Sequence, residues 1–187
     1  MRIMKKIFTI LFLIFSTSIF SQSIFDKYED MENVSSLLIN SKMFKMLSEM
    51  NIGTVNSSEG ELFGQFKNLN SLIVYSTNDD IISKSIITDV KSYVYDSKLE
   101  ELMRIKENNQ EIKFFIRPGN DDYNVSELLM LVTGNINYVK GKSFSTILLS
   151  LIGGIDLRTI SNLTQKLDIP GGQALQNASR KNKKIKK

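Results

Sequence analysis

The sequence predicts an α+β fold: an antiparallel sheet of about six strands with two main helices packed on one face, plus a short N-terminal helix. Two observations support this fold class. Short apolar runs separated by turn residues follow one another between residues 99 and 152, which favours consecutive antiparallel strands in a meander. Two earlier segments instead repeat apolar residues every three or four positions, which is typical of amphipathic helices.

The first elements are predicted between residues 25 and 50. In residues 25–31, apolar side chains recur three apart among charged ones, which indicates a short helix. VSSLLIN, residues 34–40, predicts a strand. Ser41 then offers an N-cap hydroxyl to a helix whose apolar stripe is expected to face the core. This stripe consists of Met43, Met46, Leu47 and Met50. Residues 51–61 are polar and predict a loop.

A second strand and a second helix follow. SLIVYS, residues 71–76, predicts the strand. Thr77 or Asn78 is the expected N-cap of the helix, and Asp79 and Asp80 suit the positive end of its dipole. The helix is expected to end near Asp96. Its apolar face consists of Ile82, Ile86, Val90 and Tyr93.

The remaining chain predicts four strands and a last helix. The strands are predicted at residues 99–106, 111–117, 126–132 and 145–152. The later connections, residues 117–124 and 133–142, are expected to be loops. Asp156 is the expected start of a helix that Pro170 and its neighbouring glycines stop. The apolar side of this helix consists of Leu157, Ile160, Leu163 or Thr164, and Leu167.

Both termini differ in composition from the single domain predicted at residues 22–168. Three basic residues precede an apolar run at residues 7–20, which is the layout of a signal peptide covering residues 1–21. The run is shorter than the roughly 20 apolar residues of a membrane-spanning helix. Residues 169–187 form a predicted disordered tail with six basic residues. These are Arg180, Lys181, Lys183, Lys184, Lys186 and Lys187.

The charge distribution indicates an acidic body with a basic tail. The chain has 24 basic and 20 acidic residues, and removal of the signal peptide leaves 21 basic residues. Six of these lie in the tail, so the body has 15 basic against 20 acidic residues. Such a tail is attracted to anionic membrane surfaces. Nucleic acid is not an expected partner, because no basic patch is interleaved with aromatic residues.

The absence of histidine and cysteine narrows the chemistry. Without them the chain has no His-based catalytic triad, no thiolate metal site and no disulfide framework. No catalytic set of base, nucleophile and orienting group stands out, so we expect no enzyme, and we expect no cofactor or metal.

Three short motifs remain as candidate sites. Gly153 and Gly154 precede Asp156, but a phosphate loop needs more glycines and a lysine, so we expect a turn out of the strand followed by a helix cap. Asn120, Asp121, Asp122 and Asn124 offer oxygens for calcium but lack the EF-hand spacing, so a hairpin turn is expected. The third motif comprises the carboxylates Asp96, Glu100 and Glu101. Its adjacent glutamates point to opposite faces of a strand and do not act together.

Three segments carry a resemblance to a known family. They are FDKYEDMENVSSLLINSKMFKML, SELLMLV and GGIDLRTISNL, in that order. Together they resemble the exported bacterial family catalogued as domain of unknown function 4252, over about residues 25–167. The resemblance implies a small secreted α+β domain of Gram-negative envelopes and no assigned activity. The basic tail and the cysteine-free signal have no counterpart in that pattern.

These observations favour a non-catalytic exported domain of the periplasm or cell envelope. It is expected to bind another envelope protein or the anionic membrane surface, with the basic tail adding electrostatic attachment. A first alternative is a carrier that holds a small apolar ligand between the sheet and the helix at residues 43–50. A second alternative is a hydrolase that uses Asp or Glu.

Overall fold

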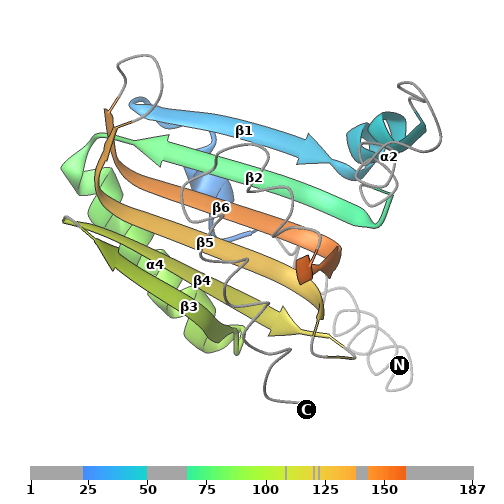
Figure 1. Cartoon of the computed structure of the whole chain (residues 1–187). Coiled ribbons are helices and arrows are strands. Elements are labelled where there is room, and N and C mark those ends of the chain that lie inside the picture. The colour runs from blue at the N-terminus through green and yellow to red at the C-terminus, as the bar shows by residue number, and fades with distance from the viewer. Residues whose placement is uncertain are drawn as a thin grey trace, which may run out of the picture.

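The computed structural model describes residues 23–49, 67–107, 109–119, 121, 123–137 and 143–158 (Figure 1). The predicted signal peptide, the loop at residues 51–61 and the basic tail lie outside these residues. The elements are the 3-10 helix η1 (Asp26–Tyr28), the helices α2 (Ser41–Glu49) and α4 (Asp80–Asp96), and the strands β1 (Val34–Asn40), β2 (Leu69–Thr77), β3 (Glu100–Glu107), β4 (Gln110–Pro118), β5 (Asn124–Asn137) and β6 (Ser143–Asp156). Neither described α-helix is long and apolar enough to cross a membrane.

The six strands form one antiparallel sheet in the order β1-β2-β6-β5-β4-β3. The predicted α+β class and the meander of the last four strands are therefore confirmed. After this meander, β6 pairs with β2, so the two longest strands, β5 and β6, lie in the middle of the sheet. Within the described residues, β1 and β3 are the two edges, as Figure 1 shows.

One face of the sheet is covered by α4 and η1. Ile86 and Val90 of α4 are fully buried against this face, at the spacing that the sequence predicts. Phe25, directly before η1, and Tyr28, its last residue, pack into the same cluster. The sheet supplies alternate residues of its strands to this cluster, because side chains of a strand point to opposite faces in turn. These are Ile73, Tyr75, Phe115, Leu129, Leu131 and Leu148.

The opposite face carries a second apolar cluster, and α2 packs there. Phe44 is 3% exposed and belongs to the cluster that contains Phe114 and Met130. The prediction that both main helices share one face is therefore wrong. The predicted methionine stripe is also wrong as a core face, because Met43 and Met46 are about half exposed, at 46% and 51%. Phe44, the aromatic residue between them, turns towards the sheet instead.

The start of α4 differs from the prediction by one position. Asp79, and not Thr77 or Asn78, is the N-cap, because its carboxylate accepts hydrogen bonds from the backbone N–H groups of Ile81 and Ile82. A carboxylate at this position satisfies unpaired amides and suits the helix dipole. The hydroxyl of Thr77 accepts the N–H of Asp79 and so fixes the corner between β2 and α4.

Tyr28, the last residue of η1, and Tyr75 of β2 have contrasting surroundings. The Tyr28 hydroxyl donates to the Asp89 carboxylate and lies 2.8 Å from the Ser85 hydroxyl. Tyr75 is 1% exposed, and its hydroxyl has no hydrogen-bond partner within the described residues. Burial and then the nearby carboxylates of the η1 region raise the pKa of Tyr75 to about 12.

The two tyrosines predict opposite responses to loss of the hydroxyl. We expect Tyr75→Phe to change the free energy of unfolding by less than about 1 kcal/mol, because a buried, unpaired hydroxyl contributes no hydrogen bond. The matched change Tyr28→Phe should lower it by about 1–3 kcal/mol, since Asp89 and Ser85 lose their partner. Urea unfolding at neutral pH measures both values. Equal losses of unfolding free energy in the two variants would contradict the conclusion that, among the described residues, the Tyr28 hydroxyl is hydrogen-bonded and the Tyr75 hydroxyl is not.

Tyr75 also predicts a loss of stability in alkali. In the unfolded chain a tyrosine ionises near pH 10, whereas Tyr75 in the fold keeps its proton up to about 12. Between these values the folded state binds more protons, so stability falls as pH rises. Urea midpoints measured from about pH 9 to about pH 12 should fall more steeply in the native chain than in Tyr75→Phe. Parallel curves would refute this origin of the effect.

Candidate functional site

Two of the predicted candidate motifs meet at one end of the sheet. The connection between β4 and β5 lies beside the end of β6, and an open groove of about 730 Å³ is formed there. Its lining includes Asp121, Asn124 and the glycine pair Gly153 and Gly154. The sheet thus brings the acidic loop and the glycine motif together, although they are about 30 residues apart in sequence. The carboxylates Asp96, Glu100 and Glu101 are not part of this groove.

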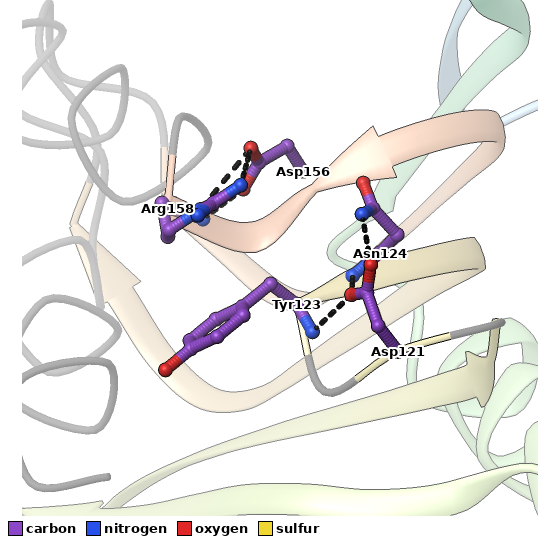
Figure 2. A network of polar contacts seen from close by, with 5 residues as sticks. All are labelled: Asp121, Tyr123, Asn124, Asp156 and Arg158. Atoms are coloured by element: carbon purple, nitrogen blue, oxygen red, sulfur yellow. Dashed lines mark hydrogen bonds and ion pairs between the residues drawn. The ribbon is translucent and has the colours of Figure 1, made fainter. Parts of the chain in front are cut away.

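Asp121 is occupied by the turn that it builds. One carboxylate oxygen accepts the backbone N–H groups of Tyr123 and Asn124, at 2.8 and 2.7 Å. The other oxygen accepts the side-chain amide of Asn124 at 2.7 Å (Figure 2). These hydrogen bonds, the one from the Asn124 side chain first, lower the pKa of Asp121. The carboxylate therefore stabilises a local turn, as the sequence predicts; Asn120 and Asp122 lie outside the described residues.

Arg158 and Asp156 form a second local pair beside this turn. The guanidinium donates to both carboxylate oxygens of Asp156, and the backbone N–H of Arg158 donates to the same carboxylate at 2.9 Å. Arg158 also lies over the ring of Tyr123, 4.9 Å from its centroid, as Figure 2 indicates. The hydrogen bonds from Arg158 lower the pKa of Asp156. The predicted cap at Asp156 is confirmed, and the chain is helical at residues 157–158; the rest of the predicted helix lies outside the described residues.

The glycine pair does not turn the chain out of the strand, so that prediction is wrong. β6 continues through Gly153 and Gly154 to Asp156. Gly153 has φ +143°, and a Cβ there would lie 2.5 Å from the backbone oxygen of Asn68. That oxygen accepts the N–H of Gly154 at 2.7 Å. The pair therefore allows close approach of the chain ahead of β2.

An ion pair between the buried Glu127 and the partly exposed Arg117 lines the groove. Glu127 is 3% exposed, and its carboxylate accepts from the Arg117 guanidinium at 3.0 and 3.3 Å. The Tyr93 hydroxyl of α4 donates to Glu127 at 2.8 Å, and Arg117 also donates to the backbone oxygen of Ser97. Burial, and then the bond to Glu127, raise the pKa of Tyr93. This network ties the end of α4 to β4 and β5.

This network was not predicted from the sequence, although the sequence contains one sign of it. Glu127 is the single charge in the apolar run SELLMLV, and lone charges within such runs need a buried partner. The partner follows only from the register, in which Arg117 is directly opposite Glu127. Local sequence patterns do not contain that register.

The charged groups at this end of the sheet satisfy one another. Asp121, Asp156 and Glu127 each accept hydrogen bonds from the chain itself. Where a carboxylate pKa is shifted here, it is lowered, whereas a general acid needs a raised one. In the part of the chain that the structure describes, no cluster of three acidic residues is placed to hold a metal ion. The contacts at this end therefore serve the fold.

The third candidate motif is divided between two elements, because Asp96 ends α4, whereas Glu100 and Glu101 begin β3, the charged edge of the sheet. Glu101 receives two hydrogen bonds from Arg104, at 2.6 and 3.0 Å. Five of the eight residues of β3 are charged, and charges on an edge strand discourage pairing with other strands. They are Glu100, Glu101, Arg104, Lys106 and Glu107.

The opposite edge has the reverse character. None of the seven residues of β1 is charged, and Leu37 and Leu38 are each 51% exposed. The exposed methionines Met43 and Met46 follow on α2, at the end of β1 in Figure 1. We call these four side chains, Leu37, Leu38, Met43 and Met46, the β1–α2 surface. Exposed apolar groups at an unprotected sheet edge are typical of protein interfaces.

A family model described as Domain of unknown function (DUF4252) matches residues 28–163. This range takes in the six strands and two α-helices of the described residues. No curated protein and no solved structure matches the chain.

The Arg117–Glu127 pair predicts a non-additive effect on stability. We expect Arg117→Met to lower the free energy of unfolding by about 1–3 kcal/mol, because Glu127 then stays buried with Tyr93 as its remaining hydrogen-bond donor. The double variant Arg117→Met/Glu127→Leu should lose less, since the uncompensated charge is gone. Urea unfolding of the two variants measures the difference. An equal or larger loss in the double variant would contradict this account.

Proposed function

Since this chain belongs to the DUF4252 family, whose description assigns no activity, we propose a function from the surfaces of the chain itself. In this proposal the protein is an exported, non-catalytic domain of the Gram-negative cell envelope, and it acts by binding another envelope protein. The binding site lies on the β1–α2 surface, and its centre is Met43 and Met46 of α2, beside the uncharged β1 edge. The observation that carries this proposal is the contrast between the two edges of one sheet, charged on β3 and uncharged on β1.

The chemistry of the β1–α2 surface suits a protein partner. An edge strand offers backbone N–H and C=O groups that an extended segment can pair with, and flanking apolar side chains add burial. Met43 and Met46 are flexible and polarisable, so they adapt to partners of varied shape. Protein interfaces have an apolar centre and a polar rim, and here the uncharged β1 is followed on α2 by Lys42 and Lys45 beside the methionines.

The alternatives have less support among the described residues. A carrier needs its methionines between the helix and the sheet, but Met43 and Met46 point outward and Phe44 fills the contact. A hydrolase needs a carboxyl group with a raised pKa, whereas the shifted carboxylates Asp121 and Asp156 have lowered ones. A protein-binding role asks for neither feature.

The basic tail adds electrostatic attachment to anionic lipid in this proposal. Its six basic residues lie outside the described residues, so this part rests on sequence alone. Each basic residue near such a surface contributes up to about 1 kcal/mol, and salt screens the attraction. The tail thus concentrates the domain at a membrane, while the β1–α2 surface selects the protein.

A photo-crosslinking amino acid at Met46 tests the protein partner. In intact cells we expect it to capture one envelope protein other than the chain itself, identified by mass spectrometry. The matched control places the same amino acid at Lys106 on β3, whose side chain is 78% exposed. Capture at Met46 no stronger than at Lys106, or capture of this chain alone, would overturn the proposal.

Removal of the tail tests the membrane attachment separately. We expect deletion of Ser179–Lys187 to weaken cosedimentation with vesicles that contain anionic lipid, most strongly at low salt. Vesicles of neutral lipid are the control, and both forms of the chain should bind them equally. If the deleted form binds anionic vesicles as well as the full chain does, the tail has no such role.

A further inference from the structure

We propose that β1 pairs with β1 of a second copy of this chain, antiparallel and centred on Leu38. The two sheets then join into one continuous sheet across a two-fold axis. This inference rests on the proposed function, because it takes the β1–α2 surface to be an association surface. It assigns the β1 part of that surface to self-association and leaves the methionines of α2 for another protein.

The edge of β1 is suited to strand addition. Within the described residues, β1 pairs with β2 on one side only. Leu38 lies opposite Ile73 on the α4 face of the sheet, whereas Leu37 lies opposite Val74 on the other face. Both leucines are half exposed, so an added strand would bury apolar area on both faces. No charged residue of β1 opposes this addition.

The side-chain pattern of β1 selects the register. In an antiparallel pair, directly opposed residues share a face of the sheet. A two-fold axis between two copies of β1 must therefore place one residue opposite its own copy, and not opposite its neighbour in sequence. An axis at Leu38 places Leu38 opposite Leu38, Leu37 opposite Ile39, and Ser36 opposite Asn40. Over residues 36–40, which are the part of β1 that pairs in this register, apolar residues then face apolar ones and polar residues face polar ones.

An axis one residue earlier gives a poorer match. Centred on Leu37, the pairing places Ser36 opposite Leu38 and Ser35 opposite Ile39. Each apolar side chain except Leu37 would then oppose a polar one. Cross-strand pairs of like character are the more favourable ones, so the structure favours Leu38 as the centre.

The charges on either side of β1 complement each other in this arrangement. The acidic residues Glu29, Asp30 and Glu32 precede the strand, and Lys42 and Lys45 follow it. Antiparallel pairing places the acidic end of one copy beside the basic end of the other. Complementary charges at the rim of an interface steer association and fix its register.

Pairing of β1 with the other edge of a second copy is disfavoured. It would oppose Leu37 and Leu38 to the charged residues of β3. It would also be a head-to-tail contact, which leaves a free edge at each end and continues into filaments. Pairing of β1 with itself buries both uncharged edges and leaves only the charged β3 edges outside.

Single cysteines test the register cleanly, because the chain contains none. In the proposed dimer the two Leu38 Cα atoms are about 4.5–5.5 Å apart, which is within the range of a disulfide. We therefore expect Leu38→Cys to form a covalent dimer under mild oxidation. Ser36→Cys, on the same face, is the matched control, because its two Cα atoms are on the order of 14 Å apart. It should remain monomeric in a denaturing gel.

Two outcomes would overturn the inference. Leu38→Cys treated with reducing agent is the reference. If Leu38→Cys gives no covalent dimer without reductant, β1 does not pair with itself here. If Ser36→Cys forms the dimer equally well, the register is wrong. Capture of another protein from Met46 in the same cells would leave the proposed function intact in either case, so the two failures are distinguishable.

A charged residue at the proposed two-fold axis tests the dimer independently of disulfide formation. Leu38→Lys places two ammonium groups opposite each other across the axis, and we expect the dimer dissociation constant to rise at least about tenfold. Sedimentation equilibrium measures this constant, and circular dichroism verifies the fold, which should persist because Leu38 is half exposed. Lys106→Leu, on the β3 edge, is the control for surface charge. An unchanged dissociation constant for Leu38→Lys would contradict the proposal.

Discussion

Burial of the central strands on both faces is the constraint on which the rest of the structure depends. Residues 128–132 of β5 are consecutive, apolar and at most 7% exposed. Because neighbours in a strand point to opposite faces, such a run needs cover on both sides. On one side α4 and η1 provide it; on the other side lies the cluster that Phe44 joins. Charge is thereby excluded from the buried centre of β5; on β4, Lys113 is paired with Glu111, and most other charges lie at the ends and edges of the sheet.

The ends and the edges then handle charge in different ways. At the end of β5 the buried charge of Glu127 is neutralised by Arg117 and hydrogen-bonded by Tyr93. The acidic side chains nearby close turns and caps, so this groove has little charge left to offer a ligand. At the β3 edge the charges stay in solvent and protect the strand. β1 has neither a neutralising ion pair nor exposed charges, so it is the edge that is more open to pairing with another strand.

The sequence predicts what depends on local pattern. β1 was predicted to the residue, and the strands of the meander were predicted in order, because turn residues and apolar runs are local signals. The face that a helix turns to the core was not predictable in the same way. The periodicity of α2 predicts that its methionines face the core, but Phe44 is the side chain that packs against the sheet. The Arg117–Glu127 pair, the length of β6 and the position of β1 at an edge all depend on strand register and order, which are non-local.

Symmetry connects self-association to the binding of another protein. A two-fold axis perpendicular to the sheet keeps both copies of α4 on one face of the joined sheet. Because α2 starts at Ser41, three residues after Leu38, the axis also brings both copies of α2 near the junction. A partner that contacts Met43 and Met46 would therefore meet two equivalent sites at short separation. Two linked sites raise the effective concentration of the second contact, so weak apolar patches can give firm binding when the partner is itself paired.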